Sequence, residues 1–550
     1  MTIRFPDHEH TGQAAYPNLA AWPPWLLEKH GAQMLDPATA TRTDATNTLR
    51  STVYRNAVLL FPRAVLTDTA VRGRIEDEVL GPMGLTLRDS DNEFPPVTLP
   101  EELAGLDQEL LRRFPVPVAL NVRAGARAVV DAWEAVQAIR LWARRDGGVE
   151  LADDAGAEET RREEVLATSV EHLLVGANFN GVPTWGPGDV RDEDGGSGGS
   201  AYRLIPVAFT GPRPVRQPCA RRVVVAVPDT GVNVHPWFGV SKVGDPLPPN
   251  GFLLPYLASE VAIKEQQERL GKLTPTRVLM DCWERDAYED TLSENLSRAT
   301  GHFTFIAGRI HQNAPDADIL VMRVLHPDNI CYEADLLLAL WLLIARVKRA
   351  HEGHPKDLVD IVSLSLGGFV EKDSSQASHL RTAISTLTGL GVLVVAAAGN
   401  DSSTRPFYPA ALATEDPNTP WPGERVFGVG ALNPDGTQAW FSNAGPNVTI
   451  EASGANVVST FPTRLRGNRG AFRTTENGLR QVADPDRFRG GWAVGSGTSY
   501  AAPEVAAALA NCLRDQNTVA ITEVGADLMR ARAEAAVKLL TDQVHANGSD

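Results

Sequence analysis

The sequence predicts an α/β protein with a doubly wound, mainly parallel sheet and an additional N-terminal α+β region. Four very apolar runs between residues 223 and 400 end at Gly-rich or polar turns, and helical stretches lie between them. Continuous apolar runs of this kind are typical of strands that helices cover on both faces. Upstream of residue 200, strand and helix also alternate, and there they indicate a smaller, separate unit.

The length of the chain indicates more than one folded part. A chain of 550 residues is too long for one ordinary core, because single cores seldom grow beyond roughly 250–300 residues. The segment 191–200 (RDEDGGSGGS) is rich in Gly and Ser, which makes it a flexible linker. We therefore predict an N-terminal region over residues 1–200 that ends in this linker, a main α/β domain over residues 215–515 and a C-terminal helical tail over residues 516–550.

Two strand–helix pairs are predicted in the N-terminal region. The apolar strand 57–61 (AVLLF) precedes a helix that begins at Asp68, and the strand 116–122 precedes a helix over residues 124–140. The second helix is predicted from apolar residues at mostly three- and four-residue spacing, such as Val129, Trp133 and Val136. None of these segments indicates a function.

The main domain is predicted from the apolar runs 223–231 (VVVAVPDTG), 317–325 (ADILVMRVL), 359–368 (VDIVSLSLGG) and 391–400 (GVLVVAAAGN). Asp229, Ser365 and Asn400 fall at the carboxyl ends of these runs. Ligands of doubly wound sheets bind beyond the carboxyl ends of the strands, so these residues are candidates for a functional site. The stretch 336–345 (LLLALWLLIA) is about half the roughly 20 residues needed to cross a bilayer, and it predicts a buried helix.

Composition disfavours several classes of partner. The formal net charge of −16 argues against nucleic acid and anionic membranes. The first residues have no apolar run behind a basic segment, as a secretory signal would, so the sequence favours a cytoplasmic protein and leaves export open. The four cysteines have no CxxC spacing and are predicted to be buried thiols, and no metal site is assigned.

Asp229 is delivered by a buried strand into the turn AVPDTGV. Taken by itself, this carboxylate has an equally good explanation as the acceptor of a local Asx-turn. DTG also occurs in aspartic proteases, where two carboxylates share a proton. This chain has one DTG and no DSG, which argues against a single-chain aspartic protease.

His302 and Ser499 are the other two candidates for chemistry. His302 lies in GHFTFIAG (301–308), where a loop would enter a helix; an isolated histidine is more often structural, but a partner such as Asp229 would fix its tautomer and stabilise its protonated form. Ser499 lies in GSGTSYAAP (495–503), whose glycines permit a tight turn into a helix N-terminus. Backbone amides there favour an oxyanion, although a plain serine N-cap is the alternative.

Together these segments resemble the subtilisin-like serine protease family (subtilases, peptidase family S8). The resemblance covers residues 223–513. AVPDTGVNVHPWF is similar to the aspartate motif of the family, GHFTFIAG to its histidine motif and GTSYAAPEVA to its serine motif. SLSLGG (363–368) and AAAGN (396–400) resemble its substrate-binding strand and its oxyanion-asparagine segment.

The resemblance implies a sheet of subtilisin type and a serine endopeptidase that cleaves polypeptides through an acyl-enzyme. It implies Asp229, His302 and Ser499 as the catalytic triad and Asn400 as the oxyanion donor. The substrate-binding residues that it implies are Ser365, Leu366, Gly367, Ala397 and Gly399. No cofactor is predicted; the family often binds calcium, and a structural calcium site at the acidic stretch 281–290 is the alternative to the simpler interpretation of a solvated acidic face.

Three features depart from the family pattern. Where the family usually has Gly and His in the histidine motif, this chain has Phe303 and Phe305, from which we expect altered packing or substrate entry rather than lost chemistry. The acidic stretch 281–290 (DCWERDAYED) predicts an extra loop or helix at the rim of the cleft, with its acidic residues on a solvated face. The Arg-rich segment 464–489 predicts an inserted surface loop.

Two functional questions stay open in the sequence. A pseudo-enzyme that binds peptides in the same cleft without cutting them is the alternative to an active protease. The N-terminal region is prodomain-like or regulatory, which makes it a candidate inhibitor or regulator of the peptidase domain. A cut between residues 186 and 220, around the accessible Gly-rich linker, would separate the two parts.

Overall fold

The computed structural model of the chain describes most of its length. The described residues are 2–6, 22–42, 48–145, 149, 155–177, 204–209, 211–219, 221–290, 295–371, 378–414, 425–467, 472–481, 487–515 and 524–547. The predicted linker at 191–200 lies outside these residues.

An eight-stranded sheet forms the centre of the molecule, and all neighbouring strands are parallel except the first pair. In order across the sheet the strands are β1 (Ile3–Arg4), β19 (Ile450–Ser453), β18 (Val426–Leu432), β17 (Leu393–Ala397), β15 (Ile361–Leu364), β9 (Val224–Asp229), β13 (Asp318–Arg323) and β10 (Leu253–Pro255). The predicted mainly parallel sheet is therefore confirmed. Its edge strand β1 comes from the start of the chain.

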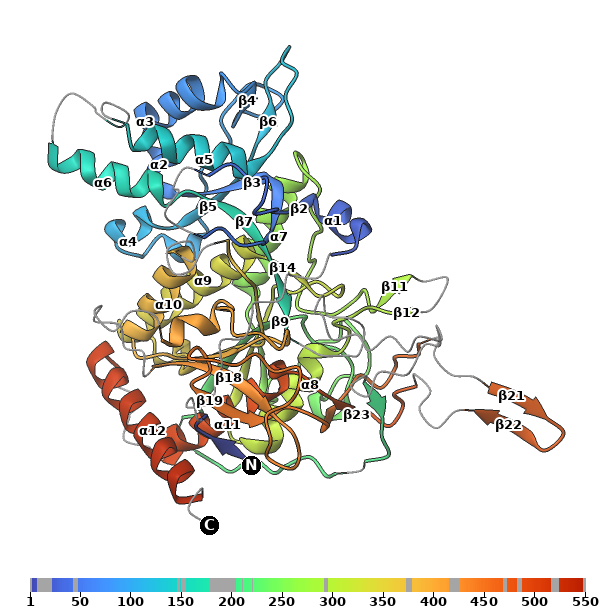
Figure 1. Cartoon of the computed structure of the whole chain (residues 1–550). Helices are drawn as coiled ribbons and strands as arrows, with labels where there is room; N and C mark the ends of the chain where they lie inside the picture. The colour runs from blue at the N-terminus through green and yellow to red at the C-terminus, as the bar shows by residue number, and fades with distance from the viewer. Residues whose placement is uncertain are drawn as a thin grey trace.

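Both faces of this sheet are covered, as the continuous apolar runs predict. Along β9, Val225 and Val227 belong to one apolar cluster and Val224 and Ala226 to another, because successive side chains of a strand point to opposite faces. The first cluster includes residues of α8 (His302–Asn313), α11 (Thr498–Asp515) and α12 (Ala526–Asn547). The second includes residues of α7 (Leu257–Gly271), α9 (Glu333–His351) and α10 (Ser378–Gly389), and α9 contains the predicted buried helix. Figure 1 shows α9 and α10 on the side of the sheet that faces the N-terminal region.

The N-terminal region contains an antiparallel sheet of β2 (Ala32–Met34), β3 (Val53–Pro62), β5 (Pro115–Ala119) and β7 (Ser169–Gly176), with helices packed on it. This confirms the α+β prediction. The helix predicted at Asp68 is α3 (Thr69–Arg74), and the Asp68 carboxylate caps it by accepting hydrogen bonds from the amides of Ala70 and Val71.

Two boundaries predicted in this region are wrong. The helix predicted over residues 124–140 is α5 (Ala132–Ala143), which begins only after Asp131, whose side chain accepts the amide of Trp133. Val129, which supported the earlier start, is 88% exposed and does not face the core. The strand predicted over 116–122 is split into β5 and a short β6 (Asn121–Val122), which pairs with β4 (Leu85–Thr86) instead of β3.

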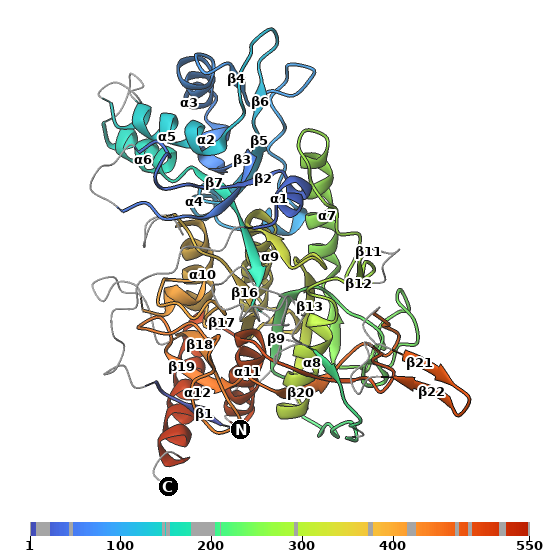
Figure 2. The ribbon, with the colours of Figure 1, turned by 45° about the vertical axis from the view of Figure 1, so that its right-hand side comes forward.

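One strand, β7, connects the two parts of the molecule. Its first half pairs with β3 of the N-terminal region. Its second half lies between β14 (Ile330–Tyr332) and β16 (Leu366–Gly367) of the main domain, antiparallel to both. Figure 2 shows β7 running from the upper unit down to β16. The strand thereby brings Ala177, the next residue, to the carboxyl edge of the main sheet.

The two segments with unusual charge contain short antiparallel strand pairs. In the acidic stretch, β11 (Tyr288–Asp290) pairs with β12 (Asn295–Leu296), so the predicted extra element is strand and loop, not helix. In the Arg-rich segment, β21 (Phe472–Thr475) pairs with β22 (Gly478–Gln481) in a hairpin that projects from the body of the molecule (Figure 1). Residues 468–471 and 482–486 of that segment lie outside the described residues.

Candidate active site

Asp229 and His302 meet where β9 ends and α8 begins. Nδ1 of His302 lies 2.9 Å from both Oδ1 and Oδ2 of Asp229, and both side chains are fully buried. Oδ1 of Asp229 also accepts a hydrogen bond of 2.7 Å from the amide of Thr230. The carboxylate therefore serves the local turn and the histidine together, and it can fix the imidazole in the tautomer that carries its proton on Nδ1.

The first turn of α8 is anchored by Glu284, a residue of the acidic stretch. The amide of Gly301 lies 2.9 Å and 3.0 Å from the two carboxylate oxygens of Glu284, and Asn233 Nδ2 donates to the same carboxylate at 2.8 Å. Burial raises the pKa of Glu284 to about 7, although the hydrogen bonds from Asn233 and Gly301 oppose the shift. The solvated face predicted for this stretch is thus wrong for Glu284, which is 1% exposed.

Ser499 is the second residue of α11 and lies at the N-terminal end of that helix. The next residue, Tyr500, places its ring centroid 5.7 Å from that of His302, so the first turn of α11 lies beside the histidine. Within the described part of the chain, Ser499 Oγ and His302 Nε2 are both buried without a hydrogen-bond partner. The amide of Ser499 does have one, because it donates to the carbonyl oxygen of Ala177 at 2.9 Å.

Asn400 follows β17 and is oriented by the same helix end. Its Oδ1 accepts hydrogen bonds of 2.9 Å from both the amide and the Oγ1 of Thr498. Oδ1 is therefore occupied, and Nδ2 is the end of the side chain that can donate to a ligand. Gly399 has a φ of 99°, and a Cβ on it would lie 2.4 Å from Asn443 Nδ2, so this turn requires glycine.

The residues predicted to bind substrate lie along one edge of the same site. The carbonyl of Ser365 accepts a hydrogen bond from the amide of Ala177 at 2.9 Å, while Leu366 and Gly367 form β16 and pair with Gly176 and Val175. The other two predicted residues are Ala397, the last residue of β17, and Gly399, whose amide donates to Thr498 Oγ1. The predicted substrate strand is thus paired with β7.

Phe303 and Phe305 are both fully buried. Phe305 packs against Tyr500, with ring centroids 4.1 Å apart, and the amide of Phe303 donates to Thr230 Oγ1 at 3.1 Å. Both rings are thus packed inside the protein, and their effect on packing relative to the family or on substrate entry stays a prediction.

Two participants in this geometry, Ala177 and Glu284, have no clear signal in the sequence. Ala177 belongs to no motif, because only the register of β7 against β16 brings it to Ser499. Glu284 stands in an acidic stretch in which Asp281 and Arg285 are partly solvated, so its own burial has no local signal. Among the residues that the structure describes, no three His, Cys, Asp or Glu side chains are grouped as metal ligands.

A doubly wound sheet that presents an Asp–His pair beside a serine at a helix N-terminus is typical of serine hydrolases. The profile of the subtilase family matches residues 220–544, more than half of the chain. The chain therefore belongs to the subtilase family, the subtilisin-like serine proteases.

Curated relatives are similar over part of their length. The chain is 30% identical over 224 residues to the major intracellular serine protease of Bacillus subtilis (strain 168), covering 39% of this chain and 56% of the relative. It is 26% identical over 321 residues to an extracellular basic protease of Dichelobacter nodosus, covering 56% of this chain and 45% of the relative. The chain thus spans about half the length of these relatives.

Among solved structures, a cold-adapted subtilisin-like serine proteinase matches with 21% identity and a TM-score of 0.33, over 56% of this chain and 81% of that chain. No helix in the described part of the chain has the length and apolar character needed to cross a membrane.

Proposed function

We propose that the chain is a serine endopeptidase with Asp229, His302 and Ser499 as its triad. Ser499 Oγ attacks the carbonyl carbon of a peptide bond while His302 Nε2 takes its proton. Asp229 holds the imidazole through Nδ1 and stabilises the imidazolium. The proton then passes to the leaving amine, and water releases the acyl group by the reverse sequence. The reaction uses no cofactor, and a structural calcium ion is not part of the proposal.

The observation that carries the proposal is a peptide carbonyl held at the proposed nucleophile. The oxygen of Ala177 accepts the amide hydrogen of Ser499 at 2.9 Å. The carbonyl that this amide polarises would become the oxyanion when Ser499 Oγ attacks. His302 Nε2, unpartnered among the described residues, is free to accept the serine proton.

Asn400 is proposed as the second oxyanion donor, and Asn400→Ala tests that role. We expect kcat to fall about 10²- to 10³-fold with little change in KM, because the bond from Nδ2 forms mainly in the transition state; the worked case behind this range is the equivalent residue of subtilisin. Steady-state kinetics on a fluorogenic peptide gives both constants. A rise in KM at constant kcat would instead assign Asn400 to ground-state binding.

The N-terminal region is proposed to inhibit the peptidase domain in the same molecule. β7 fills the place between β14 and β16 that an extended substrate would take by strand addition. His172 of β7 holds it there through buried contacts with Glu333 and Glu371 of the main domain, at 2.6 Å and 2.8 Å. A substrate can enter only when this strand leaves.

A pseudo-enzyme that binds peptides without cutting them is the alternative to this proposal. A fluorophosphonate probe separates the two, since it reacts with an activated serine and with nothing in a mere binding cleft. If the protein is labelled and the Ser499→Ala variant is not, the result supports an active protease. Labelling absent from protein that has been freed of its N-terminal region would favour the pseudo-enzyme.

Two buried carboxyl groups predict how stability depends on pH. Burial raises the pKa of Glu284 and of Asp335 to about 7 each, against hydrogen bonds that lower it. The folded state therefore holds more protons than the unfolded state between about pH 4 and pH 7, and each group contributes stability that is complete below its unfolded pKa and is lost as the pH rises through 7. We expect the free energy of unfolding to fall by roughly 3 kcal/mol per group over this range.

Urea unfolding of the Ser499→Ala protein between pH 4.5 and 8 measures this slope without self-digestion. Glu284→Gln should flatten the slope, whereas Glu352→Gln, at an exposed position, should leave it unchanged. An identical slope in the Glu284→Gln protein would show that Glu284 titrates normally.

A cytoplasmic location also stays a proposal. The four cysteines are free thiols, which suits a reducing compartment. Relatives include both intracellular and extracellular proteases. Fractionation of the source cells would test it, and recovery of the protein outside the cells would contradict it.

A further inference from the structure

We infer that Glu284 is a positioning residue of the proposed triad, because its carboxylate joins the turn after Asp229 to the start of the helix that carries His302. Glu284 sets the relative position of these two side chains and takes no part in the bond changes. The inference rests on the proposed endopeptidase activity and adds a residue to the same site.

The Glu284 carboxylate contacts both of the segments that bear Asp229 and His302. Its two oxygens accept the amide of Gly301, the residue before His302, at 2.9 Å and 3.0 Å. Oε2 also accepts a hydrogen bond of 2.8 Å from Nδ2 of Asn233, which lies in the turn after Asp229. The other end of the Asn233 side chain is fixed as well, since its Oδ1 accepts the next amide of the turn at 2.7 Å. One buried carboxylate therefore connects the end of β9 to the first turn of α8.

The main chain at Glu284 is packed directly on the turn after Asp229. The amide of Glu284 donates to the carbonyl oxygen of Val232 at 2.9 Å, and the amide of Val232 donates to the carbonyl oxygen of Cys282 at 2.7 Å. This approach requires glycine in the turn, because a Cβ on Gly231, whose φ is 90°, would lie 2.3 Å from the carbonyl oxygen of Cys282. The contact fixes where the carboxylate stands relative to the turn.

Arg323 supports the same arrangement from within the sheet. It pairs with Asp229 in the register of β13 and β9, and it is 4% exposed. Its Nη1 donates to the carbonyl oxygens of Trp283 and Asp281. The guanidinium group thus holds the acidic stretch against the edge of the sheet at which Asp229 lies.

The ionised form of Glu284 is the form that suits these contacts. Both carboxylate oxygens face N–H donors, so protonation of either oxygen weakens at least one of the bonds. Burial raises the pKa of Glu284 to about 7 and the charge of Asp229 adds to the shift, whereas the bonds from Asn233 and Gly301 and the charge of Arg323 oppose it. The positioning is therefore strongest above pH 7 and weakens as the pH falls through that value.

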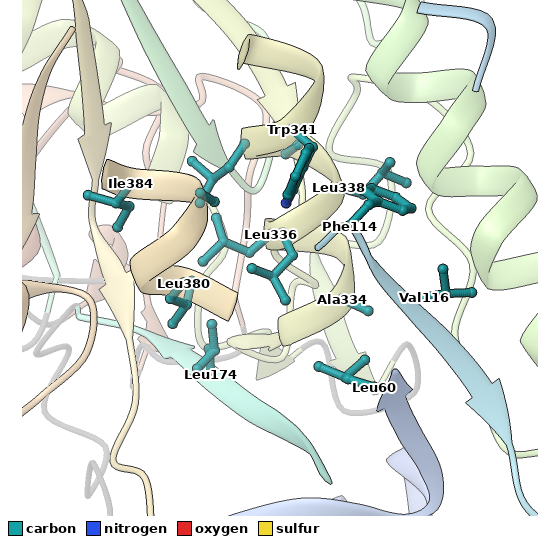
Figure 3. Packing of buried hydrophobic residues seen from close by; sticks show 14 of the residues in the cluster. Leu60, Phe114, Val116, Leu174, Ala334, Leu336, Leu338, Trp341, Leu380 and Ile384 are labelled. Carbon is teal, nitrogen blue, oxygen red and sulfur yellow. The ribbon is translucent and has the colours of Figure 1, made fainter. Parts of the chain in front are cut away.

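The contacts of Glu284 are separate from the apolar surface that holds the N-terminal region. Cys282 and Trp283 belong to the cluster on the face of the sheet that α8 covers. The apolar contacts of the N-terminal region lie on the other face, where Figure 3 shows Phe114 beside Trp341 of α9, with ring centroids 5.4 Å apart. A variant of Glu284 should therefore change the chemistry without changing how the N-terminal region docks.

The first test is steady-state kinetics on a fluorogenic peptide, with the chain cleaved between residues 186 and 220 and diluted until hydrolysis appears. At pH 8 we expect Glu284→Gln to lower kcat about tenfold and Glu284→Ala about 10²-fold, with KM within about threefold, because a displacement of about 1 Å in the catalytic groups can cost 10²-fold. Asp286→Asn, at an exposed position of the same stretch, is the matched control and should keep the wild-type kcat. Near-UV circular dichroism on the same samples refers each kcat to folded protein.

The second test uses pH to separate positioning from a purely structural role. Glutamine is a neutral counterpart of protonated Glu284. The ratio of kcat/KM between the wild-type and Glu284→Gln proteins should therefore fall from about tenfold at pH 8 towards one at pH 5.5. Protonation of His302 affects both proteins alike and cancels from this ratio. The ratio between the wild-type and Asp286→Asn proteins should stay near one throughout.

Three outcomes would overturn the inference and leave the protease proposal intact. They are a wild-type kcat in the folded Glu284→Gln protein at pH 8, a ratio that does not change with pH, and a higher KM at unchanged kcat, which would assign Glu284 to substrate binding. A wild-type protein that neither hydrolyses peptides nor reacts with a fluorophosphonate at Ser499 would overturn the protease proposal itself.

Discussion

Ser499→Ala is expected to abolish peptide hydrolysis and self-cleavage while leaving the fold intact. Without Oγ no acyl-enzyme can form, and in subtilisin, the reference case for this loss, removal of the serine lowers kcat by about 2 × 10⁶. The fold should survive because Ser499 Oγ makes no hydrogen bond among the described residues, while its amide bond to Ala177 does not depend on the side chain. Kinetics on a fluorogenic peptide, with circular dichroism on the same samples, measure both effects.

Ser496→Ala is a matched control in the same turn. Its Oγ accepts the amide of Asn456 at 2.9 Å, so its loss should affect stability slightly and leave the chemistry in place. Hydrolysis that persists in the Ser499→Ala protein at more than about a thousandth of the normal rate would remove Ser499 from the role of nucleophile.

The sequence is sufficient to locate these residues because each stands at the end of a strongly patterned element. Asp229 closes a strand that is buried on both faces, and Asn400 follows another. Both strands are recognised from their local run of apolar residues, so they can be predicted without knowing which strands are neighbours in the sheet. Parallel strands then carry both residues to one edge of the sheet, where helix N-termini supply His302 and Ser499.

The position of β7 in the cleft depends on contacts between residues that are distant in sequence. β7 alternates weakly, since all but one of its residues are buried, and it pairs with partners more than 100 residues away. Its pairing with β14 and β16 therefore cannot be predicted from the local sequence pattern. The wrong start of α5 has the opposite cause: Val129 fits the helical spacing but is exposed, and the cap at Asp131 decides where the helix begins.

The second prediction with a large expected effect concerns His172, at the centre of β7. Its ring lies between Glu333 and Glu371, and its amide donates to Glu333 at 3.1 Å as well. Burial by itself would lower the pKa of His172, but the two carboxylates outweigh it and raise the pKa to about 10. The histidine is therefore charged at neutral pH, and its single positive charge lies between two carboxylates that are only 2% and 1% exposed.

His172→Ala should release the peptidase from its N-terminal region. Removing one partner from a buried ion pair costs about 3–5 kcal/mol, because the remaining charges are left uncompensated. Here that cost falls on the docked state alone, since Glu333 and Glu371 regain water when β7 leaves. We expect the N-terminal region to bind the peptidase domain about 10²- to 10³-fold more weakly. The measurement is a dilution series of the cleaved complex, in which the protein concentration where peptide hydrolysis appears reports the dissociation constant.

Two further variants distinguish lost charge from lost shape. His354→Ala, at an exposed histidine, should leave inhibition unchanged. Replacing His172, Glu333 and Glu371 together by leucine should restore much of the docking, because an apolar cluster of similar volume removes the desolvation cost of all three charges. Wild-type inhibition in the His172→Ala protein would mean that the main-chain pairing of β7 is sufficient to close the cleft.

The pH dependence of inhibition follows from the same cluster. A histidine whose pKa rises on docking contributes fully below its free pKa of about 6.5, and the contribution is lost as the pH rises through 10. Inhibition of the wild-type complex should therefore hold from pH 6 to pH 8, where the His172→Ala protein is already active. Release of the wild-type peptidase within that range would show that another group, and not His172, controls the docking of β7.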